Sequence, residues 1–238
     1  MNDTILVDGA WPAGPARHIL FDLDGTLVDS VRITCAIIDA MLADRGIDHR
    51  ADPELARAMD AVGGVAMIRA VMGVHCRDPD AELAEFRARH AVVPTPPDLA
   101  FPGVPETLAA LAAGGATLAI CSNKPQPLCE KILGDLGLAR HFRAIIGARP
   151  DLPRKPAADG ARLALAALGA VAGNALYVGD SAVDVATARA AGIPLVLVAW
   201  GYGLVDARAA APLAPVIDTP LQLLKHHGQQ SIHPNGGS

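Results

Sequence analysis

Five short runs of consecutive apolar residues are spaced along the chain. They lie at residues 19–21, 118–121, 144–146, 176–178 and 195–198. The runs are continuous and do not alternate with polar residues, which is typical of strands that are buried on both faces. We therefore expect a sheet whose two faces are both covered.

Stretches with a helical period of about 3.6 residues lie between the later runs. They cover residues 104–113, 128–136, 157–168 and 183–191. This alternation predicts an α/β fold, a Rossmann-like doubly wound parallel sheet with helices on both faces, because right-handed crossovers must pass over the sheet. Ligands of such sheets bind beyond the carboxyl ends of the strands.

Residues 31–93 break the alternation, since they show helical patterns and no convincing strand. One apolar face of the first helix is predicted to contain Ile33, Ile37, Ala40 and Met41. Leu83 and Phe86 continue this pattern in the last helix of the segment. The segment is expected to be an inserted helical cap.

The predicted domain organisation follows from this interruption. A core domain of residues 17–30 and 98–227 is expected to carry a cap domain of residues 31–97, which returns through the stiff linker Pro94-Thr95-Pro96-Pro97. Residues 1–16 and 228–238 are rich in glycine, proline or polar residues and are predicted to be flexible ends.

Composition and charge narrow the possible functions. The formal net charge is −5 and no long Lys/Arg run occurs, which argues against a nucleic-acid-binding surface. The apolar segment at 193–200 is broken by Pro194 and too short to span a bilayer. The four cysteines lack the close spacing of a zinc site or disulfide framework. We expect a cytoplasmic protein with reduced thiols and neither a membrane nor a nucleic-acid partner.

Two carboxylates, Asp22 and Asp24, follow the first predicted strand directly in the segment DLDGTLVDS. A simple turn is the alternative interpretation, because aspartate and glycine are common in turns. An EF-hand fits poorly, since its loop follows a helix and has glycine at the sixth position. Here Gly25 is fourth and follows a strand.

Three further polar groups follow later strands. Ser122-Asn123-Lys124-Pro125 precedes a predicted helix, Lys155 lies in a Pro-Arg-Lys-Pro segment, and Asp180 and Asp184 open another helix. A helix N-terminus can bind an anion. Taken singly, these residues are also explained as a capped helix, a surface lysine and an N-cap.

The shared position of these groups favours a functional interpretation, because all of them fall at one edge of the predicted sheet. Asp22, Asp24 and Asp180 would crowd negative charge, which is unfavourable unless a cation neutralises it. Carboxylate oxygens suit Mg²⁺. The sequence therefore predicts a magnesium site at this edge.

The ordered motifs resemble those of the haloacid dehalogenase superfamily. That family has an Asp-x-Asp-x-Thr motif, then Ser or Thr, then Lys, then Gly-Asp-x-x-x-Asp, and the resemblance covers residues 18–203. Within the superfamily, Ser122-Asn123-Lys124-Pro125 and Gly201-Tyr202-Gly203 are most similar to phosphoglycolate phosphatases. The resemblance implies a magnesium-dependent phosphatase that hydrolyses a small phosphate monoester through an aspartyl-phosphate.

The resemblance also implies roles for the motif residues. Asp22 would be the nucleophile, and Asp24 the general acid and then the general base. Ser122 and Lys155 would bind the phosphoryl oxygens. Asp180 would bind Mg²⁺ together with Asp22 and the backbone carbonyl of Asp24.

Further roles are expected around this set. Asp184 would hold a metal-bound water or Lys155. Thr26 and Asn123 are expected to contribute to substrate binding.

The substrate is expected to contact the cap. Gly63-Gly64 could form a cap loop that faces the site, although an ordinary helix-helix turn explains the pair equally well. Arg69 or Arg32 could bind a substrate carboxylate such as that of phosphoglycolate. Two departures from the phosphoglycolate phosphatase pattern bear on the substrate. Ala157-Ala158 stands where His-Pro is usual, and Ala182-Val183 where Arg-Asn is usual.

Other functions remain open at this stage. A phosphomutase of the β-phosphoglucomutase type commonly has Val at the position of Thr26, which favours hydrolysis here. A non-catalytic phosphate-binding module should have lost one of the motif aspartates, and all are present. A partner-binding role for the cap is a third possibility. We expect a monomer or a homodimer that acts on a small-molecule phosphate ester.

Overall fold

The computed structural model describes residues 17–227 and contains a parallel six-stranded sheet. The strand order is β3-β2-β1-β4-β5-β6, and each neighbouring pair is parallel. The strands are β1 (His18–Phe21), β2 (Thr117–Pro125), β3 (Phe142–Ala148), β4 (Ala175–Gly179), β5 (Leu195–Val198) and β6 (Val216–Ile217). The α/β fold expected from the alternation is therefore present.

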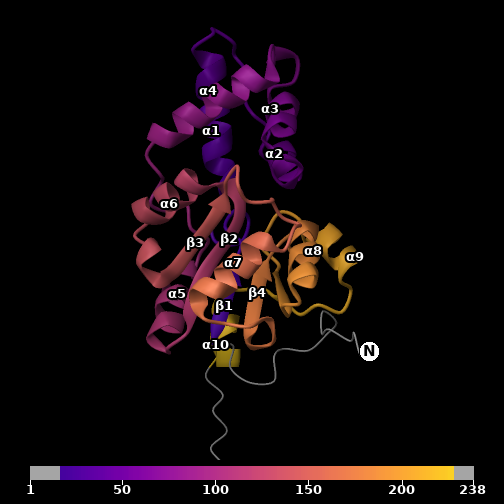
Figure 1. Ribbon diagram of the computed structural model, residues 1–238. Coiled ribbons are helices and arrows are strands. Elements are labelled where there is room, and N and C mark those ends of the chain that lie inside the picture. The colour runs from indigo at the N-terminus through magenta and orange to yellow at the C-terminus, as the bar shows by residue number, and fades with distance from the viewer. Residues whose placement is uncertain (1–16, 228–238) are drawn as a thin grey trace, which may run out of the picture.

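Helices cover both faces of the sheet (Figure 1). They are α5 (Val104–Ala113), α6 (Gln126–Asp135), α7 (Asp159–Leu168), α8 (Ala182–Ala191), α9 (Leu204–Ala210) and α10 (Gln222–His227). Side chains of α5, α6 and α10 share one buried cluster with Phe21 and Ile120, whereas those of α7, α8 and α9 share the other with Leu20 and Ala119. Successive strand residues thus enter opposite clusters, as the pleat requires.

The sequence predicted five of the six strands and four of the core helices. The helix predicted at 104–113 matches α5 at both ends. Strand β2 ends at Pro125, four residues later than expected, and α7 begins at Asp159, two residues later than expected. Strand β6 escaped prediction because it is only two residues long, too short for a recognisable apolar run. The predictions for residues 1–16 and 228–238 lie outside the described residues.

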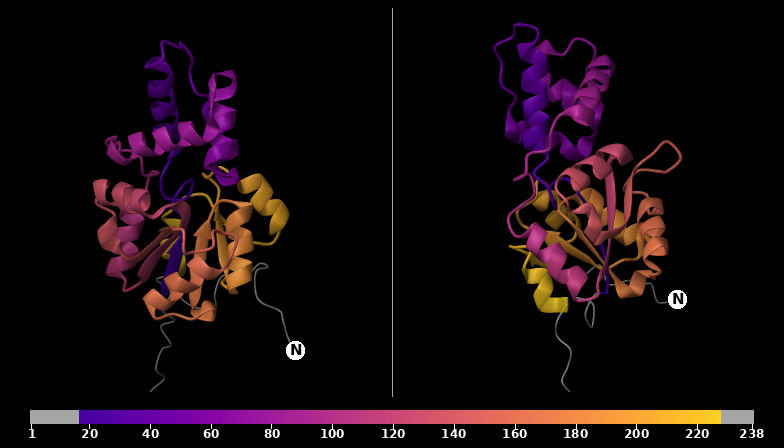
Figure 2. Two further views of the ribbon diagram at one scale, coloured as in Figure 1. Left: turned by 45° about the horizontal axis from the view of Figure 1, so that its top comes forward. Right: turned by 90° about the vertical axis from the view of Figure 1, so that its left-hand side faces the viewer.

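The segment at residues 31–97, here called the helical insert, contains α1 (Val31–Ala43), α2 (Pro53–Met59), α3 (Gly64–Met72) and α4 (Pro79–Val92). Short 3₁₀ turns follow α2 at Asp60–Val62 and α3 at Gly73–His75. Two more lie in the core, at Ala139–His141 and Ala172–Asn174. The four helices of the insert pack on one another beyond the carboxyl ends of the strands, as the two further views also show (Figure 2).

The buried face of α1 differs in one position from the prediction. Ile33, Ile37 and Met41 are buried, but Ala40 is exposed. Ile38 and Leu42 are buried in its place, because the second apolar row of the helix runs one position after the first, along i, i+4 and i+8. Within residues 17–227 no helix is both long and apolar enough to cross a membrane.

Candidate active site

The last residues of β2 and the loops that follow β1, β3 and β4 meet at the carboxyl edge of the sheet. They bring Asp22, Ser122, Lys155 and Asp180 to one wall of a cleft of about 530 Å³. The opposite wall belongs to the helical insert, including Gly63 and Met67. Parallel strands end at the same edge, so residues distant in the chain gather there for a topological reason. The volume suits a small molecule.

Asp22 lies at the base of this cleft with only 8% of its surface exposed. Its Oδ1 accepts a hydrogen bond from the backbone N–H of Leu23 at 2.7 Å and lies 2.9 Å from Nζ of Lys155. Burial raises the pKa of Asp22 well above its usual range; Lys155 opposes this rise, and the carboxylates of Asp184 and Asp180 add to it. A positive charge near Asp22 would therefore favour its carboxylate form.

Lys155 joins Asp22 to Asp184. Its Nζ lies 2.8 Å from Asp184, which is completely buried, and Lys155 itself is only 9% exposed. Burial acts to lower the pKa of Lys155, but Asp184 and Asp22 outweigh it and raise the pKa. The lysine is therefore a fixed ammonium at the base of the cleft.

Asp184 is held by more than the lysine. One oxygen accepts from the Tyr177 hydroxyl at 3.2 Å, and the other accepts from the Ser181 hydroxyl at 2.7 Å and from the Ser181 N–H at 3.0 Å. Ser181 and Asp184 form a capping box at the start of α8. Both oxygens of Asp184 are thus engaged within the protein.

Asn123 holds the loop that presents Lys155. Its Oδ1 accepts from the Lys155 N–H at 2.8 Å, and its Nδ2 donates to the Lys155 carbonyl at 3.0 Å. The Lys155–Pro156 peptide is cis. Ser122 lies beside this loop on the cleft wall, where its Oγ accepts from the Lys124 N–H at 3.2 Å. The serine proton is left to donate to a bound group.

Asp180 is positioned by the loop that follows β5. Its Oδ2 accepts the N–H groups of Tyr202 at 2.7 Å and Gly203 at 3.3 Å, and its Oδ1 accepts the Thr26 hydroxyl at 3.2 Å. A Cβ on Gly201 would lie 2.2 Å from the Cβ of Asp180. Only glycine lets this loop approach the aspartate so closely.

Carboxylate oxygens of Asp22, Asp180 and Asp184 lie within 4.8 Å of one another. They are hard oxygen donors, which suit Mg²⁺. Burial raises the pKa of Asp180, and the carboxylate of Asp184 adds to the rise. The repulsion among these groups fits a site that a divalent cation would neutralise. Asp22 and Asp180 are the candidate ligands because they line the cleft, whereas Asp184 does not.

Asp24 forms an ion pair that the sequence reasoning did not anticipate. Nζ of Lys124 lies 2.9 and 3.0 Å from the two carboxylate oxygens of Asp24. The pair joins residues 100 positions apart. Both residues line the cleft.

The remaining predicted site residues divide between the cleft and other locations. Gly63 and Gly64 line the cleft. Thr26 is buried and does not line it, because its hydroxyl is directed to Asp180. Arg69 does not line it either: it is exposed on α3, two positions from Met67 and hence on another face of that helix. Arg32 is paired with Asp98 at 2.9 Å.

Several polar residues of the insert that line the cleft were missed, among them Asp60 and His90. Asp60 follows α2, and desolvation by the cleft walls raises its pKa, although its side chain still contacts the solvent in the cleft. His90 lies near the end of α4 and is 2% exposed. No sequence signal marked either residue, since one aspartate and one histidine on helical segments are common without function.

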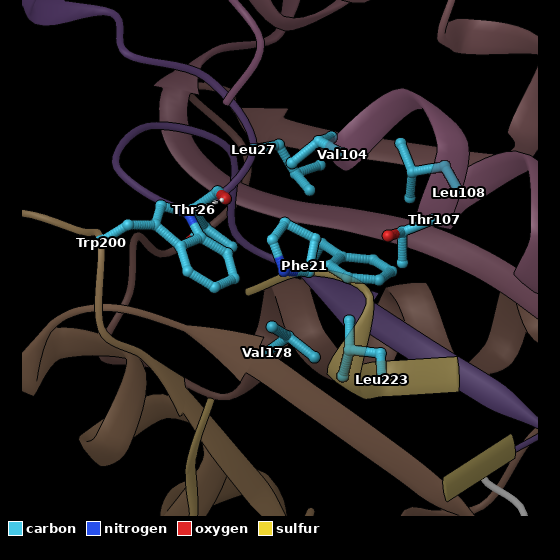
Figure 3. A pocket seen from close by; sticks show the side chains of 10 residues that line it. Phe21, Thr26, Leu27, Val104, Thr107, Leu108, Val178, Trp200 and Leu223 are labelled. Carbon is cyan, nitrogen blue, oxygen red and sulfur yellow. Dashed lines mark hydrogen bonds between the residues drawn. The ribbon is translucent and has the colours of Figure 1, made fainter. Parts of the chain in front are cut away.

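A second cavity, on the α5 side of the sheet, is too small to bind a ligand (Figure 3). Its volume is about 10 Å³, comparable to one water. Phe21, Val178 and Leu223 line it, and the indole N–H of Trp200 donates to the Thr26 carbonyl at 3.0 Å beside it. The Thr107 hydroxyl there has no partner within residues 17–227. The cleft under the insert is therefore the candidate active site.

The fold and this buried cluster define an α/β enzyme with an acidic, lysine-containing site beneath a helical insert. The family model described as haloacid dehalogenase-like hydrolase matches residues 19–198. The chain belongs to this family of hydrolases.

Named relatives support the same assignment. A phosphoglycolate phosphatase of Rhodospirillum rubrum is 36% identical over 194 residues, covering 78% of this chain and 80% of the relative. One from Cereibacter sphaeroides is 36% identical over 223 residues, covering 90% and 93%. The crystal structure of a predicted phosphoglycolate phosphatase from Haemophilus somnus 129Pt has a TM-score of 0.73 and 25% identity, and covers 88% of this chain and 96% of that one.

Proposed function

We propose that this protein is a magnesium-dependent phosphatase that hydrolyses a small phosphate monoester through an aspartyl-phosphate intermediate. The observation that carries the proposal is the position of Asp22, which is buried at the base of the cleft and 2.9 Å from the Lys155 ammonium. In this proposal residues 17–30 and 98–227 form the catalytic core, and residues 31–97 form its cap.

Asp22 is proposed as the nucleophile. Its free oxygen attacks phosphorus, the bond from phosphorus to the ester oxygen breaks, and the leaving alkoxide takes a proton from Asp24. Asp24 then removes a proton from water, whose oxygen attacks the phosphorus of the aspartyl-phosphate. Phosphate leaves and Asp22 returns to its carboxylate form. Asp24 must be protonated in the first step and ionised in the second, so its contact with Lys124 has to loosen as the ester binds.

The phosphoryl oxygens would be bound by two residues that are already fixed. Ser122 has a hydroxyl proton free to donate, and Lys155 is held by Asp184 and by both backbone bonds to Asn123. A donor held in place before the reaction stabilises developing negative charge without reorganising. Asp184 is proposed to act through Lys155, which it orients at 2.8 Å.

Magnesium would be held by Asp22 and Asp180, with the backbone carbonyl of Asp24 as a further ligand. When bound, the ion supplies positive charge that lets a carboxylate approach a phosphate dianion. Thr26, Tyr202 and Gly203 hold Asp180 for this task through three hydrogen bonds.

The named relatives suggest the first compound to test. They are phosphoglycolate phosphatases, so phosphoglycolate belongs in any substrate panel. All four cysteines are free, which supports a reducing, cytoplasmic location as part of the proposal. We also propose that the protein acts as a monomer or a homodimer.

The proposal is tested by measuring phosphate release from a panel of monoesters that includes phosphoglycolate, sugar phosphates and p-nitrophenyl phosphate. Release in Mg²⁺, its loss in excess EDTA and its return on adding further Mg²⁺ are the expected results. Isomerisation of a sugar phosphate without net hydrolysis would establish a mutase instead. No reaction with any ester would contradict both enzyme assignments and favour a phosphate-binding module.

A further inference from the structure

Helix α4 presents one face to the cleft. Leu83, Phe86, Arg87 and His90 all line the cleft, and their spacing of three and four residues places them on one side of the helix. Met67 of α3 and Leu128 of α6 line the same cleft. The leaving-group side of the cleft therefore combines apolar side chains with the buried imidazole of His90 and the exposed guanidinium of Arg87.

His90 has unused hydrogen-bonding capacity. It is 2% exposed, and neither ring nitrogen has a partner among the described residues. Its ring packs edge-on against Phe86 with centroids 5.6 Å apart. Burial lowers the pKa of His90 to about 4, and Lys124 adds to the effect, so the ring is neutral near pH 7. A neutral imidazole offers one donor and one acceptor.

Buried polar groups in native proteins are almost always hydrogen-bonded, and an unpaired one requires an explanation. A bound ligand that completes the missing hydrogen bonds is such an explanation. His90 lines the cleft, but both of its ring nitrogens are covered in this conformation. A molecule in the cleft would therefore become its partner after a rotation of the imidazole ring.

Asp60 contributes an exposed carboxylate to the same cleft. Within residues 17–227 its carboxylate takes part in no hydrogen bond or ion pair given by the structure, although the charges of Asp24 and Lys124 influence it. Lys124 is engaged by both oxygens of Asp24, so its charge is largely matched. Asp60 is therefore available to accept a hydrogen bond from a substrate.

We propose that His90 and Asp60 bind hydroxyl groups of the leaving group, so that the preferred substrate is the phosphate ester of a polyol or sugar. This inference rests on the proposed phosphatase function. A hydroxyl group donates and accepts, which matches both a neutral imidazole and a carboxylate. The inferred substrate class differs from that of the named relatives, whose phosphoglycolate substrate carries a carboxylate in place of hydroxyl groups.

A carboxylate fits this part of the cleft less well. It only accepts hydrogen bonds, so it can pair with the N–H of a neutral imidazole but not with the carboxylate of Asp60. Three arginines also line the cleft. Arg57 is already ion-paired with Glu54, and the side chains of Arg87 and Arg154 are exposed, where water and salt screen their attraction.

The test compares glycerol 3-phosphate with propyl phosphate, which has the same three carbons and no hydroxyl groups. The wild-type kcat/KM is expected to be at least about tenfold higher for glycerol 3-phosphate than for propyl phosphate, and higher than for phosphoglycolate. His90→Phe keeps an aromatic ring against Phe86 and removes both nitrogens. This variant should lower the ratio of kcat/KM for glycerol 3-phosphate to kcat/KM for propyl phosphate by about tenfold or more.

His141→Phe is the matched control. His141 is half-buried, and its Nε2, like the ring nitrogens of His90, lacks a partner within the described chain, but it lies outside the cleft. This variant should keep the wild-type ratio. Asp60→Ala should lower the ratio, whereas Asp60→Asn, which still accepts a hydrogen bond, should keep most of it. Far-ultraviolet circular dichroism establishes that each variant is folded.

Binding to the inactive Asp22→Asn variant in Mg²⁺ provides a readout without turnover. By calorimetry, glycerol 3-phosphate should bind more tightly than propyl phosphate, and the added His90→Phe change should remove the difference. Two results would overturn the inference while leaving the phosphatase proposal intact. One is an equal wild-type kcat/KM for glycerol 3-phosphate and propyl phosphate, and the other is a ratio of these two kcat/KM values that His90→Phe leaves unchanged. Failure to hydrolyse any ester, p-nitrophenyl phosphate included, would overturn the phosphatase proposal and this inference with it.

Discussion

The two walls of the cleft differ in how their polar atoms are satisfied. On the core wall, Asp22, Lys155 and Asp184 form a continuous chain of contacts of 2.8 to 2.9 Å. On the insert wall, His90 and Asp60 have no hydrogen-bond or ion-pair partner in the described part of the chain. Both walls nevertheless line the same cleft.

This difference indicates a division of labour. Groups that must stabilise a transition state are held before the substrate arrives, because reorganising them during the reaction would cost free energy. Groups that select a substrate gain specificity when they are satisfied only by the correct ligand. We infer that the core wall performs the chemistry and the insert wall selects the ester.

The strongest test of the core wall is Asp22→Asn. The amide is nearly isosteric but a poor nucleophile, so kcat should fall more than about a thousandfold while the fold is retained. Phosphate release and circular dichroism measure the two effects. Asp159→Asn, an exposed aspartate at the start of α7, is the control and should retain activity. Near-wild-type turnover by Asp22→Asn would show that another group attacks phosphorus.

The next largest effect is expected for Asp24→Asn, which also removes the carboxylate that Lys124 contacts. Loss of a general acid should lower turnover of an alkyl phosphate by about 10²–10⁴-fold. The loss should be smaller for p-nitrophenyl phosphate, whose leaving group needs little protonation. Steady-state kinetics on both esters measure the contrast. Equal losses with the two leaving groups would contradict the role of Asp24 in proton transfer.

The insert wall is tested by the pH dependence of stability. The pKa of His90 is lowered from 6.5 to about 4, so between these pH values the unfolded chain binds a proton that the folded protein does not. The free energy of unfolding should therefore fall as pH drops through this window. Relative to His90→Phe, the wild type should lose up to about 3 kcal/mol. Urea unfolding of both proteins at several pH values measures this difference, and parallel pH profiles would show that His90 is not buried in its neutral form.

Much of the architecture follows from local pattern. Continuous apolar runs marked β1 and β5, and a helical period marked α5 over Val104–Ala113, because each signal depends on neighbours in the chain. The motif residues could also be identified, since each lies at or beyond the carboxyl end of a strand and parallel strands end at one edge. Asp22, Ser122, Lys155 and Asp180 accordingly meet at the cleft.

Other features depend on how distant segments pack. The pairing of Lys124 with Asp24 spans 100 positions, and the N–H groups of Tyr202 and Gly203 reach Asp180 only because the β5 loop folds over the end of β4. Arg69 was expected at the substrate, but the rotation of α3 turns it away from the cleft.

The sequence by itself therefore determined the order of five strands and of the four core helices between them. It also placed the proposed catalytic residues at the carboxyl edge, because both results depend on local periodicity and a general rule of parallel sheets. Only the tertiary structure decided which insert side chains face that set. Asp60 and His90 reach the cleft through the packing of α2 and α4 against their neighbours and over the sheet. Helical phase and inter-helix packing are long-range properties, which residue type and spacing alone do not specify.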